Sequence, residues 1–294
     1  MLRRTQTVYI ESDPFFSPRG KVLHRFDEFL AELARAQMPC VWMTGWTRAQ
    51  LDEPRRRLGQ SDPFIGENGA GVYLPEDYFH LKGRETIRLG RYTCIPIAKP
   101  QPAAKAALEE LSRDLDISVV PLRNLSHREL SQNTGLPAKE ADLMRSRDFD
   151  ELFFFAGAGE ADLAKFRAEA KARGLTVLRL GQFWSLSCGG NLAKCVKELG
   201  ALYDRALRAH ALRIGVRVSS SEDHEKLKNE PESWPDAAFD NTLSLAGRRE
   251  GVLQEANPGE DSLPAARTNQ FHLHAPTLWD DLMARISPES GRSR

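Results

Sequence analysis

Cysteine is scarce in this sequence, and it is not arranged for metal or disulfide chemistry. The four cysteines among 294 residues are Cys40, Cys94, Cys188 and Cys195, and they form no CxxC pair. In a chain of this length, scattered cysteines are typical of reduced, mostly buried side chains. The pattern argues against a disulfide framework and a zinc site, and no histidine partner can be assigned that would make one of them a nucleophile.

Net charge and long apolar runs are also absent. The 41 basic and 41 acidic residues balance, so the field of the whole protein gives no reason to expect nucleic acid or an anionic membrane as a partner. No apolar run approaches the thickness of a bilayer, and residues 1–20 lack the unbroken apolar core of a secretory signal. We therefore expect a cytoplasmic protein without a nucleic-acid or membrane partner.

Strands and helices alternate in the N-terminal part of the chain. A strand over Thr7–Ile10 precedes a helix, and a second buried strand covers Cys40–Met43. "PFIGENGAGVYLP" reads as a strand, a glycine-rich turn and another strand. This rhythm predicts a parallel sheet with helices on both faces, in which ligands bind beyond the carboxyl ends of the strands. The apolar face of the first helix is predicted to contain Val22, Phe26, Phe29, Leu30 and Leu33.

Polar side chains follow the two predicted strands. Glu11 and Asp13 stand two residues apart after the first, and Thr44 follows the second. Two acids so close together are costly unless a cation lies between them. Thr44 fits a ligand-binding hydroxyl and an ordinary turn or helix-capping threonine equally well.

The middle of the chain has a different character. Residues 89–185 combine helical segments such as "PAAKAALEELSRDL" with a hydrophobic strand at Leu152–Phe155 and two strand segments in "LTVLRLGQFWSLS". We interpret them as an α+β unit inserted into a sheet domain formed by residues 1–88 and 186–294. The last part resumes the α/β pattern with the helix "NLAKCVKELGALYDRAL" and the strands "ALRIGVRVS" and "NTLSLAG".

Several stretches, in this order, resemble a known superfamily. "TGWTRAQL" resembles TSKTRAEL, "IGENGAGVYLPEDYF" contains an ENGA segment, and "TGLPAKEADLMRSRDFDE" resembles a segment that ends in R-EFSE. "LGQFWSL" resembles GGRFxHV, and "GRREGV" resembles a C-terminal segment. Together they resemble the haloacid dehalogenase (HAD) superfamily over nearly the whole chain, and more narrowly its Cof-type, IIB branch with mannosyl-3-phosphoglycerate phosphatase. The resemblance implies a Rossmannoid α/β core with a parallel sheet and an inserted C2-type α+β cap.

The resemblance also implies a chemistry. Such enzymes carry DxD after the first strand: the first Asp attacks phosphorus, and the second acts as acid and base. Mg²⁺ neutralises the charge there, a Thr or Ser and a Lys hold the phosphoryl oxygens, and a GDxxND loop completes the metal site. On this pattern Glu11 and Asp13 are the catalytic and metal-binding acids, and Thr44 is the phosphate-binding hydroxyl.

This sequence departs from the pattern at its chemical positions. Glu11 replaces the nucleophilic Asp, and its extra methylene moves the oxygen by about a bond length, which puts in-line attack in doubt. Pro14-Phe15 replaces the usual Gly-Thr, and proline has no N–H to offer a phosphoryl group. Leu192 stands where the Lys belongs. Lys194, two residues later, is the remaining candidate, and its alternative is a solvated helix residue.

Of the family's motifs, the GDxxND metal loop is matched least well by this sequence. Ser219 replaces a metal-binding Asp and Glu222 replaces the Asn, while Asp223 is retained. Glu11, Asp13, Glu222 and Asp223 could still offer the carboxylates that Mg²⁺ needs. The alternative is that Glu222 and Asp223 are loop acids or residues favoured by a helix N-terminus.

The resemblance also points to residues that would contact substrate. Gln182 stands in place of the Arg of GGRFxH, and Ser185 in place of its His. Arg145 and Arg147 remain, and an arginine can bind a carboxylate through two parallel hydrogen bonds. The alternative is that these arginines belong to a solvated charge run beside the "LFFF" strand. The substrate-binding candidates are Gly45, Asn68, Arg145, Arg147 and Gln182.

Two functions remain open from the sequence. Because the changes fall at the nucleophile, the Lys, a metal ligand and the cap Arg, we favour a catalytically impaired phosphatase-like protein. It would act as a binding module for a phosphorylated sugar, a sugar acid or a protein partner. The alternative is an active Mg²⁺-dependent phosphatase acting on a small sugar phosphate or phosphorylated sugar acid.

Overall fold

The structure is a computed structural model. It describes residues 6–16, 21–180, 182–219, 234–246, 270–273 and 275–287. The chain divides into two compact units, residues 1–42 with 200–294 and residues 43–199.

The first unit contains a parallel sheet with the strand order β13-β12-β11-β1-β2. β1 pairs in parallel with β11, β11 with β12, and β12 with β13. The elements of this unit are β1 (Gln6–Glu11), η1 (Asp13–Phe15), α1 (Phe26–Arg35), β2 (Cys40–Met43), β11 (Leu212–Ser219), η4 (Asp236–Ala238), β12 (Asn241–Ala246), β13 (Gln270–His272) and α9 (Leu278–Ile286). Helix α7 (Leu192–Leu207) contributes residues to both units.

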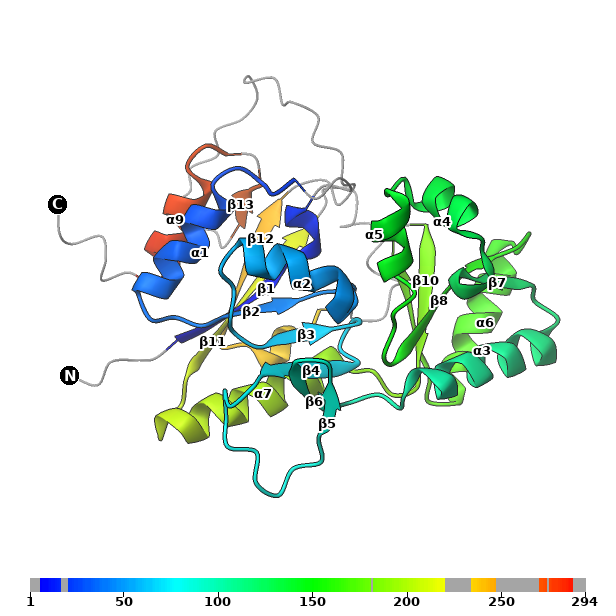
Figure 1. The fold of residues 1–294 in the computed structure, drawn as a ribbon, viewed down its shortest axis with the longest axis horizontal. Helices are drawn as coiled ribbons and strands as arrows, with labels where there is room; N and C mark the ends of the chain where they lie inside the picture. Colours follow the sequence, from blue (N-terminus) through cyan, green and yellow to red (C-terminus); the bar gives the residue numbers. More distant parts are fainter. Residues whose placement is uncertain are drawn as a thin grey trace. The chain divides into compact units, whose positions relative to one another are not determined.

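Helices α1 and α9 pack side by side in the first unit (Figure 1). The rings of Phe29 and Trp279 stack with their centroids 4.9 Å apart. The indole N–H of Trp279 donates to the carbonyl of His24 at 2.7 Å. Helix α1 begins at Phe26, later than predicted, because Arg25 adopts a left-handed backbone with φ 61°. Val22 therefore lies outside the helix.

The second unit begins with helix α2 and an antiparallel set of strands, in the order β3-β4-β6-β5. Strands β3 and β4 form a hairpin in which Phe64 and Tyr73 are opposite each other and their rings stack at 4.6 Å. The elements are α2 (Arg48–Arg57), β3 (Phe64–Gly66), β4 (Gly71–Pro75), β5 (Ile87–Leu89) and β6 (Tyr92–Pro96).

A further four-stranded sheet of the second unit has the order β7-β8-β10-β9, and its neighbouring strands pair in antiparallel fashion. The elements around it are α3 (Gln101–Leu115), β7 (Val119–Pro121), η2 (Leu122–Asn124), α4 (His127–Thr134), α5 (Ala138–Leu143), β8 (Asp150–Phe155), α6 (Glu160–Ala172), β9 (Thr176–Leu180) and β10 (Phe183–Ser187).

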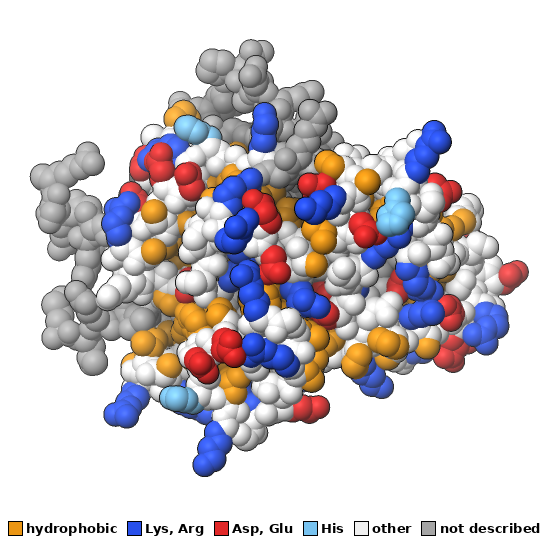
Figure 2. Space-filling view, viewed as in Figure 1, with side chains coloured by type: hydrophobic (Ala, Val, Ile, Leu, Met, Phe, Trp, Pro, Cys, Tyr) orange, Lys and Arg blue, Asp and Glu red, His pale blue; other side chains and the backbone are white. Residues whose placement is uncertain are grey.

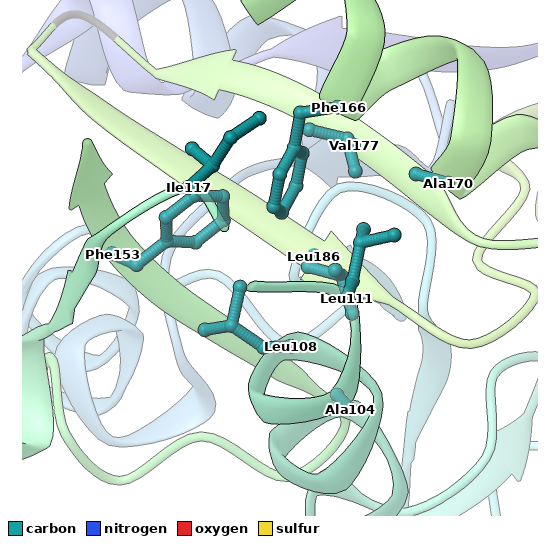
Figure 3. Close-up of a cluster of buried hydrophobic side chains, with 9 residues drawn as sticks. All are labelled: Ala104, Leu108, Leu111, Ile117, Phe153, Phe166, Ala170, Val177 and Leu186. Atoms are coloured by element: carbon teal, nitrogen blue, oxygen red, sulfur yellow. The ribbon is translucent and has the colours of Figure 1, made fainter. Parts of the chain in front are cut away.

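Alternation along β8 explains why helices cover both faces of this sheet. Phe153 points toward α3 and α6, where it packs with Leu108 and Phe166 in a buried cluster (Figure 3). Its neighbour Leu152 belongs to a separate buried cluster with Leu130 of α4. Successive side chains of a strand face opposite sides, so the "LFFF" run serves two apolar layers.

The predicted α/β class with a mainly parallel sheet is confirmed. Strand β2 covers the predicted residues Cys40–Met43, and "LTVLRLGQFWSLS" forms the antiparallel pair β9 and β10. The predicted domain boundaries, 1–88 and 186–294 around 89–185, stay a prediction.

Acidic and basic side chains are interspersed on the face of the molecule shown in Figure 2. The described side chains on this face form no broad patch of one sign. Among the described residues, no helix combines the length and apolar character needed to cross a bilayer.

Candidate functional site

The first strand ends in a carboxylate that is already hydrogen bonded. Glu11 is the last residue of β1, and its Oε2 accepts the backbone N–H of Val218 on β11 at 3.0 Å. The strand pairing places Ile10 opposite Val216, so the long glutamate side chain reaches an amide two residues further along β11. One oxygen of Glu11 thus ties the ends of the two strands together.

The turn after Glu11 is fixed by two buried phenylalanines. Asp13–Phe15 forms one turn of 3₁₀ helix. The ring of Phe15 stacks on Phe26 with the centroids 4.8 Å apart, and the ring of Phe16 lies 5.4 Å from that of Trp42. Because these two rings are buried, the turn is anchored in the core of the first unit.

Two of the predicted metal-binding acids lie together at the end of β1. Glu11 and Asp13 are half-buried, and Ser12 Oγ lies 3.4 Å from Asp13 Oδ1. Mg²⁺ requires near-octahedral oxygen coordination. Among the described residues, no group of three or more His, Cys, Asp or Glu could hold a metal ion. Glu222 and Asp223, the other predicted ligands, lie outside the described residues, so the predicted magnesium site stays a prediction.

Thr44 lies in a tightly held loop of the second unit. Its N–H donates to the carbonyl of Ile65 at 3.0 Å, and its carbonyl accepts the N–H of Asn68 at 2.9 Å. Thr44 is buried, and its Oγ1 accepts the N–H of Trp46 at 2.9 Å. This last bond fixes the position of the hydroxyl oxygen, which is the atom expected to contact a phosphoryl group.

The residue that caps helix α2 is Thr47, not Thr44. Thr47 Oγ1 accepts the N–H of Gln50 at 3.1 Å, and Gln50 Oε1 accepts the N–H of Thr47 at 3.0 Å. This capping box starts α2 at Arg48. The hydroxyl of Thr47 also donates to the carbonyl of Leu143 at 3.1 Å. The loop of residues 44–48, called the phosphate loop below because Thr44 is predicted to bind a phosphoryl group, is therefore fixed at its far end as well.

The ENGA segment is a left-handed turn that contacts helix α7. Glu67, Asn68 and Gly69 have φ angles of 48°, 55° and 88°. The carbonyl of Gly69 accepts the N–H of Asn191 at 2.9 Å. A Cβ atom at Gly69 would lie 2.6 Å from the backbone nitrogen of Leu192. Only glycine fits between the turn and the start of α7.

Gly69→Ala is expected to lower the free energy of unfolding by about 3 kcal/mol or more, because a left-handed backbone (~1–2 kcal/mol) combines with a backbone clash. Gly59→Ala is the matched control. Gly59 also has a left-handed φ, 63°, but a Cβ atom there would meet no other atom within 4 Å. This control should cost about 1 kcal/mol. Urea unfolding measures both, and equal losses would contradict the close approach of Gly69 to Leu192.

Lys194, the predicted phosphate-binding lysine, is exposed on α7. Its N–H donates to the side-chain oxygen of Asn191 at 2.8 Å, so Asn191 caps the start of the helix. Leu192, which stands at the aligned lysine position, is half-buried.

The carboxylate of Glu67 is the centre of a buried hydrogen-bond network. Its oxygens accept the N–H groups of Asp148 at 2.8 Å, Phe149 at 2.9 Å and Asp150 at 3.1 Å. The side chain is 0% exposed. One carboxylate therefore holds three successive amides at the start of β8.

Arg147 joins this network to the phosphate loop. Its guanidinium forms a two-pronged ion pair with Asp150, with Nη2 2.7 Å from Oδ2, and the same Nη2 donates to the carbonyl of Gly45 at 2.9 Å. Glu67 Oε2 lies 4.0 Å from Arg147 Nε. Ser185 Oγ donates to Asp150 Oδ2 at 2.6 Å. We call Glu67, Arg147, Asp150 and Ser185 the buried ionic cluster.

Burial controls the ionisation of this cluster. It raises the pKa of Glu67 to about 8, even though the charge of Arg147 and the amide hydrogen bonds favour the ionised form. Burial alone would lower the pKa of Arg147, but the charges of Asp150 and Glu67 outweigh it and raise that pKa. The cluster has one cation for two carboxylates.

A second ionic contact lies beside the cluster. Asp148 Oδ2 accepts a hydrogen bond from Arg48 Nε at 2.9 Å and another from the hydroxyl of Tyr73 at 3.0 Å. Arg48 is the first residue of α2, so this contact also ties the segment before β8 to the phosphate loop.

Arg145 and Gln182 contact other segments of the second unit. The guanidinium of Arg145 donates to the carbonyl of Leu125 and lies 3.4 Å from Asp142. The side-chain amide of Gln182 donates to the carbonyl of Asn133. Of the five predicted substrate-binding residues, Gly45 and Arg147 are in direct contact with each other.

The sequence motifs alone did not single out Glu67 or Asp150. Both belong to motifs that carried the resemblance, ENGA and RDFDE, where they read as scaffold residues. An acid at the start of the apolar strand "DELFFF" is the one signal that could have pointed to Asp150, because buried acids need a partner.

Curated relatives share sequence with much of this chain. The glucosyl-3-phosphoglycerate/mannosyl-3-phosphoglycerate phosphatase of Methanococcoides burtonii is 26% identical over 171 residues, 58% of this chain and 62% of that protein. The mannosyl-3-phosphoglycerate phosphatase of Pyrococcus furiosus is 25% identical over 186 residues, 63% of this chain and 73% of that protein. The match thus spans less than two thirds of the first relative. No protein-family model matches the chain.

Solved structures decide the fold. A haloacid dehalogenase-like hydrolase from B. subtilis matches with a TM-score of 0.52 at 15% identity, over 82% of this chain and 95% of that chain. This chain has the haloacid dehalogenase fold. A HAD subclass IIB sugar phosphatase matches with a TM-score of 0.50 at 13% identity, over 82% of this chain and 94% of the other. The resemblance of the sequence motifs to HAD phosphatases of the mannosyl-3-phosphoglycerate type is confirmed by these relatives.

Proposed function

We propose that this HAD-fold chain binds a small phosphorylated sugar or sugar acid and is impaired in its magnesium-dependent hydrolysis. The hydrogen bond from Val218 N–H to Glu11 Oε2 carries the proposal. A misplacement of roughly 1 Å between reacting groups can cost on the order of a hundredfold in rate. Glu11 is one methylene longer than the aspartate of the family motif, and one of its oxygens is held against β11.

The turn after Glu11 supports the same conclusion. Pro14 has no N–H to offer a phosphoryl oxygen. The rings of Phe15 and Phe16 pack into the core of the first unit. We infer that this turn cannot readily rearrange to present amide donors, because doing so would expose both rings to water.

Ligand binding would rely on Thr44, which this chain retains, and on the other substrate-binding candidates. In the proposal, the hydroxyl of Thr44, with Gly45 and Asn68, contacts the phosphoryl oxygens. Arg145 and Gln182 contact the sugar or acid portion, and residues 89–185 act as the cap over the ligand. These assignments rest on the family resemblance and on the fixed geometry of the phosphate loop.

The names of the relatives favour an alternative, an active Mg²⁺-dependent phosphatase. The Methanococcoides and Pyrococcus relatives are phosphatases of mannosyl-3-phosphoglycerate. In this alternative Glu11 or Asp13 attacks phosphorus, Lys194 steadies the phosphoryl oxygens, and Glu222 and Asp223 complete a magnesium site.

One assay separates the two functions. We expect the purified chain with Mg²⁺ to release phosphate from mannosyl-3-phosphoglycerate, and from a panel of sugar phosphates, at least about a hundredfold more slowly than a Glu11→Asp, Ser219→Asp double variant. Aspartate at position 11 puts the attacking oxygen back at the distance of the family motif, and aspartate at position 219 restores a ligand for Mg²⁺.

The control for that assay is Asp13→Ala in both backgrounds. Fast turnover by the unmodified chain that Asp13→Ala abolishes would overturn the proposed impairment and establish the phosphatase. Turnover that appears only in the double variant, and that Asp13→Ala removes there, supports the proposal.

A further inference from the structure

Arg147 connects the buried ionic cluster to one particular peptide of the phosphate loop. Its guanidinium contacts Asp150 through two nitrogens and the carbonyl of Gly45 through Nη2 at 2.9 Å. The side chain is only 5% exposed and that of Asp150 is 0% exposed. A guanidinium held so fully by its partners is poorly placed to contact a ligand directly.

The contact with Gly45 bears on Thr44 through the geometry of the peptide bond. The carbonyl of Gly45 and the N–H of Trp46 belong to one planar unit and point in opposite directions. That N–H donates to Thr44 Oγ1 at 2.9 Å. The direction of the Gly45 carbonyl therefore sets the direction of the amide that holds the threonine hydroxyl.

We propose that Arg147 is a positioning residue: by holding the Gly45 carbonyl, it orients the Gly45–Trp46 peptide and thereby places the Thr44 hydroxyl for a phosphoryl group. This inference rests on the proposed function. Glu67 contributes by fixing the three amides at the start of β8, and Ser185 by donating to Asp150 at 2.6 Å. The cluster thus gives Arg147 a rigid base from which to act on the phosphate loop.

The alternative is that Arg147 only stabilises the fold. The two roles differ in whether Arg147 acts on the ligand through Thr44. If it does, removing the Thr44 hydroxyl should abolish any effect of changing Arg147 on ligand affinity, because coupled residues show non-additive effects. A general loss of stability would leave the two effects additive.

The test is a double-mutant cycle with 3-phosphoglycerate as the probe, titrated calorimetrically into Arg147→Lys, Thr44→Val and the double variant. A lysine keeps the charge but has no planar fork, and its nitrogen ends about one bond length short of the Nη2 position, so we expect it to pair with Asp150 without reaching the Gly45 carbonyl. We expect Arg147→Lys to weaken binding about fivefold and Thr44→Val about tenfold. The double variant should bind no more weakly than Thr44→Val alone.

Arg123→Lys is the control for stability. Arg123 pairs with the buried carboxylate of Glu151 at 2.6 Å in the same unit. This variant should lose stability without a change in the dissociation constant for 3-phosphoglycerate. A weakening as large as that of Arg147→Lys would overturn the inference.

Amide hydrogen exchange tests the geometry separately from the ligand. Arg147→Lys should speed exchange of the Trp46 amide and leave that of Gln50, which Thr47 caps, unchanged. Unchanged exchange at Trp46, or fully additive losses of affinity, would overturn the role of Arg147 while the proposed function stands. Failure of the unmodified chain to bind any phosphorylated sugar acid would instead overturn the proposed function, and with it the ligand on which Thr44 is proposed to act.

Discussion

Glu67→Ala is expected to lower the free energy of unfolding by about 3 to 5 kcal/mol, since each buried donor left without an acceptor costs about 1–3 kcal/mol. Glu67 accepts three successive amides of residues 148–150, and its side chain is fully buried. Alanine leaves these donors facing a cavity beside the ion pair of Arg147 and Asp150. Urea unfolding followed by circular dichroism measures the difference.

Glu76→Ala is the matched control, because Glu76 also pairs with an arginine of the second unit. Its carboxylate lies 3.0 Å from Arg88, but the two side chains are 64% and 52% exposed. Exposed pairs contribute little to stability, because water screens them. If Glu67→Ala cost no more than Glu76→Ala, the three amide hydrogen bonds of Glu67 could not be organising the start of β8.

The stability of the protein is expected to fall as the pH rises from about 4.5 to about 8. Burial raises the pKa of Glu67 from 4.5 to about 8. Between these values the folded chain keeps a proton that the unfolded chain has released, so raising the pH favours unfolding. A pKa difference of one is worth about 1.4 kcal/mol, and the total decrease attributable to Glu67 should be about 3 to 5 kcal/mol. Urea unfolding at half-unit pH steps measures it.

Glu67→Gln isolates this contribution, because glutamine does not titrate. The variant is expected to be less stable at low pH and to lose much of the slope between pH 4.5 and 8. Burial also raises the pKa of Glu151, so part of the slope should remain in both proteins. Parallel pH profiles for the variant and the unmodified chain would show that Glu67 does not carry the raised pKa.

Secondary structure was predictable wherever the apolar pattern is strong and local. The uninterrupted run at Cys40–Met43 is β2, and the long amphipathic segment "NLAKCVKELGALYDRAL" is α7. The antiparallel pairing of β3 with β4 follows from chain length, because only four residues separate Gly66 from Gly71 and a parallel crossover needs about a dozen.

Elements whose stability comes from distant partners were harder to predict. Helix α9 (Leu278–Ile286) was missed, although its apolar face is buried against α1. Strand β13 has three residues and exists through its pairing with β12. A strand this short has little intrinsic preference, and its partner is not visible in the local sequence. Helix α9 differs, because Leu278, Trp279, Leu282, Met283 and Ile286 recur at helical spacing and the local sequence does indicate it.

The candidate site was predictable by position but not by contact. Motif order located Glu11, Thr44 and the ENGA turn, because each follows a strand. The hydrogen bond between Glu11 and Val218 joins residues 207 positions apart, so no local sequence pattern predicts it. The partners of Arg147 depend likewise on tertiary packing, so the sequence could not say whether its charge is solvated or buried.

The most direct test of the central claim is phosphorus NMR of mannosyl-3-phosphoglycerate incubated with the unmodified chain and Mg²⁺. The resonance of the phosphate ester reports binding through its position and width, and the resonance of inorganic phosphate reports hydrolysis. We predict that the ester resonance shifts or broadens as protein is added and persists over hours. Conversion of the ester to inorganic phosphate within minutes at catalytic amounts of protein would contradict the account.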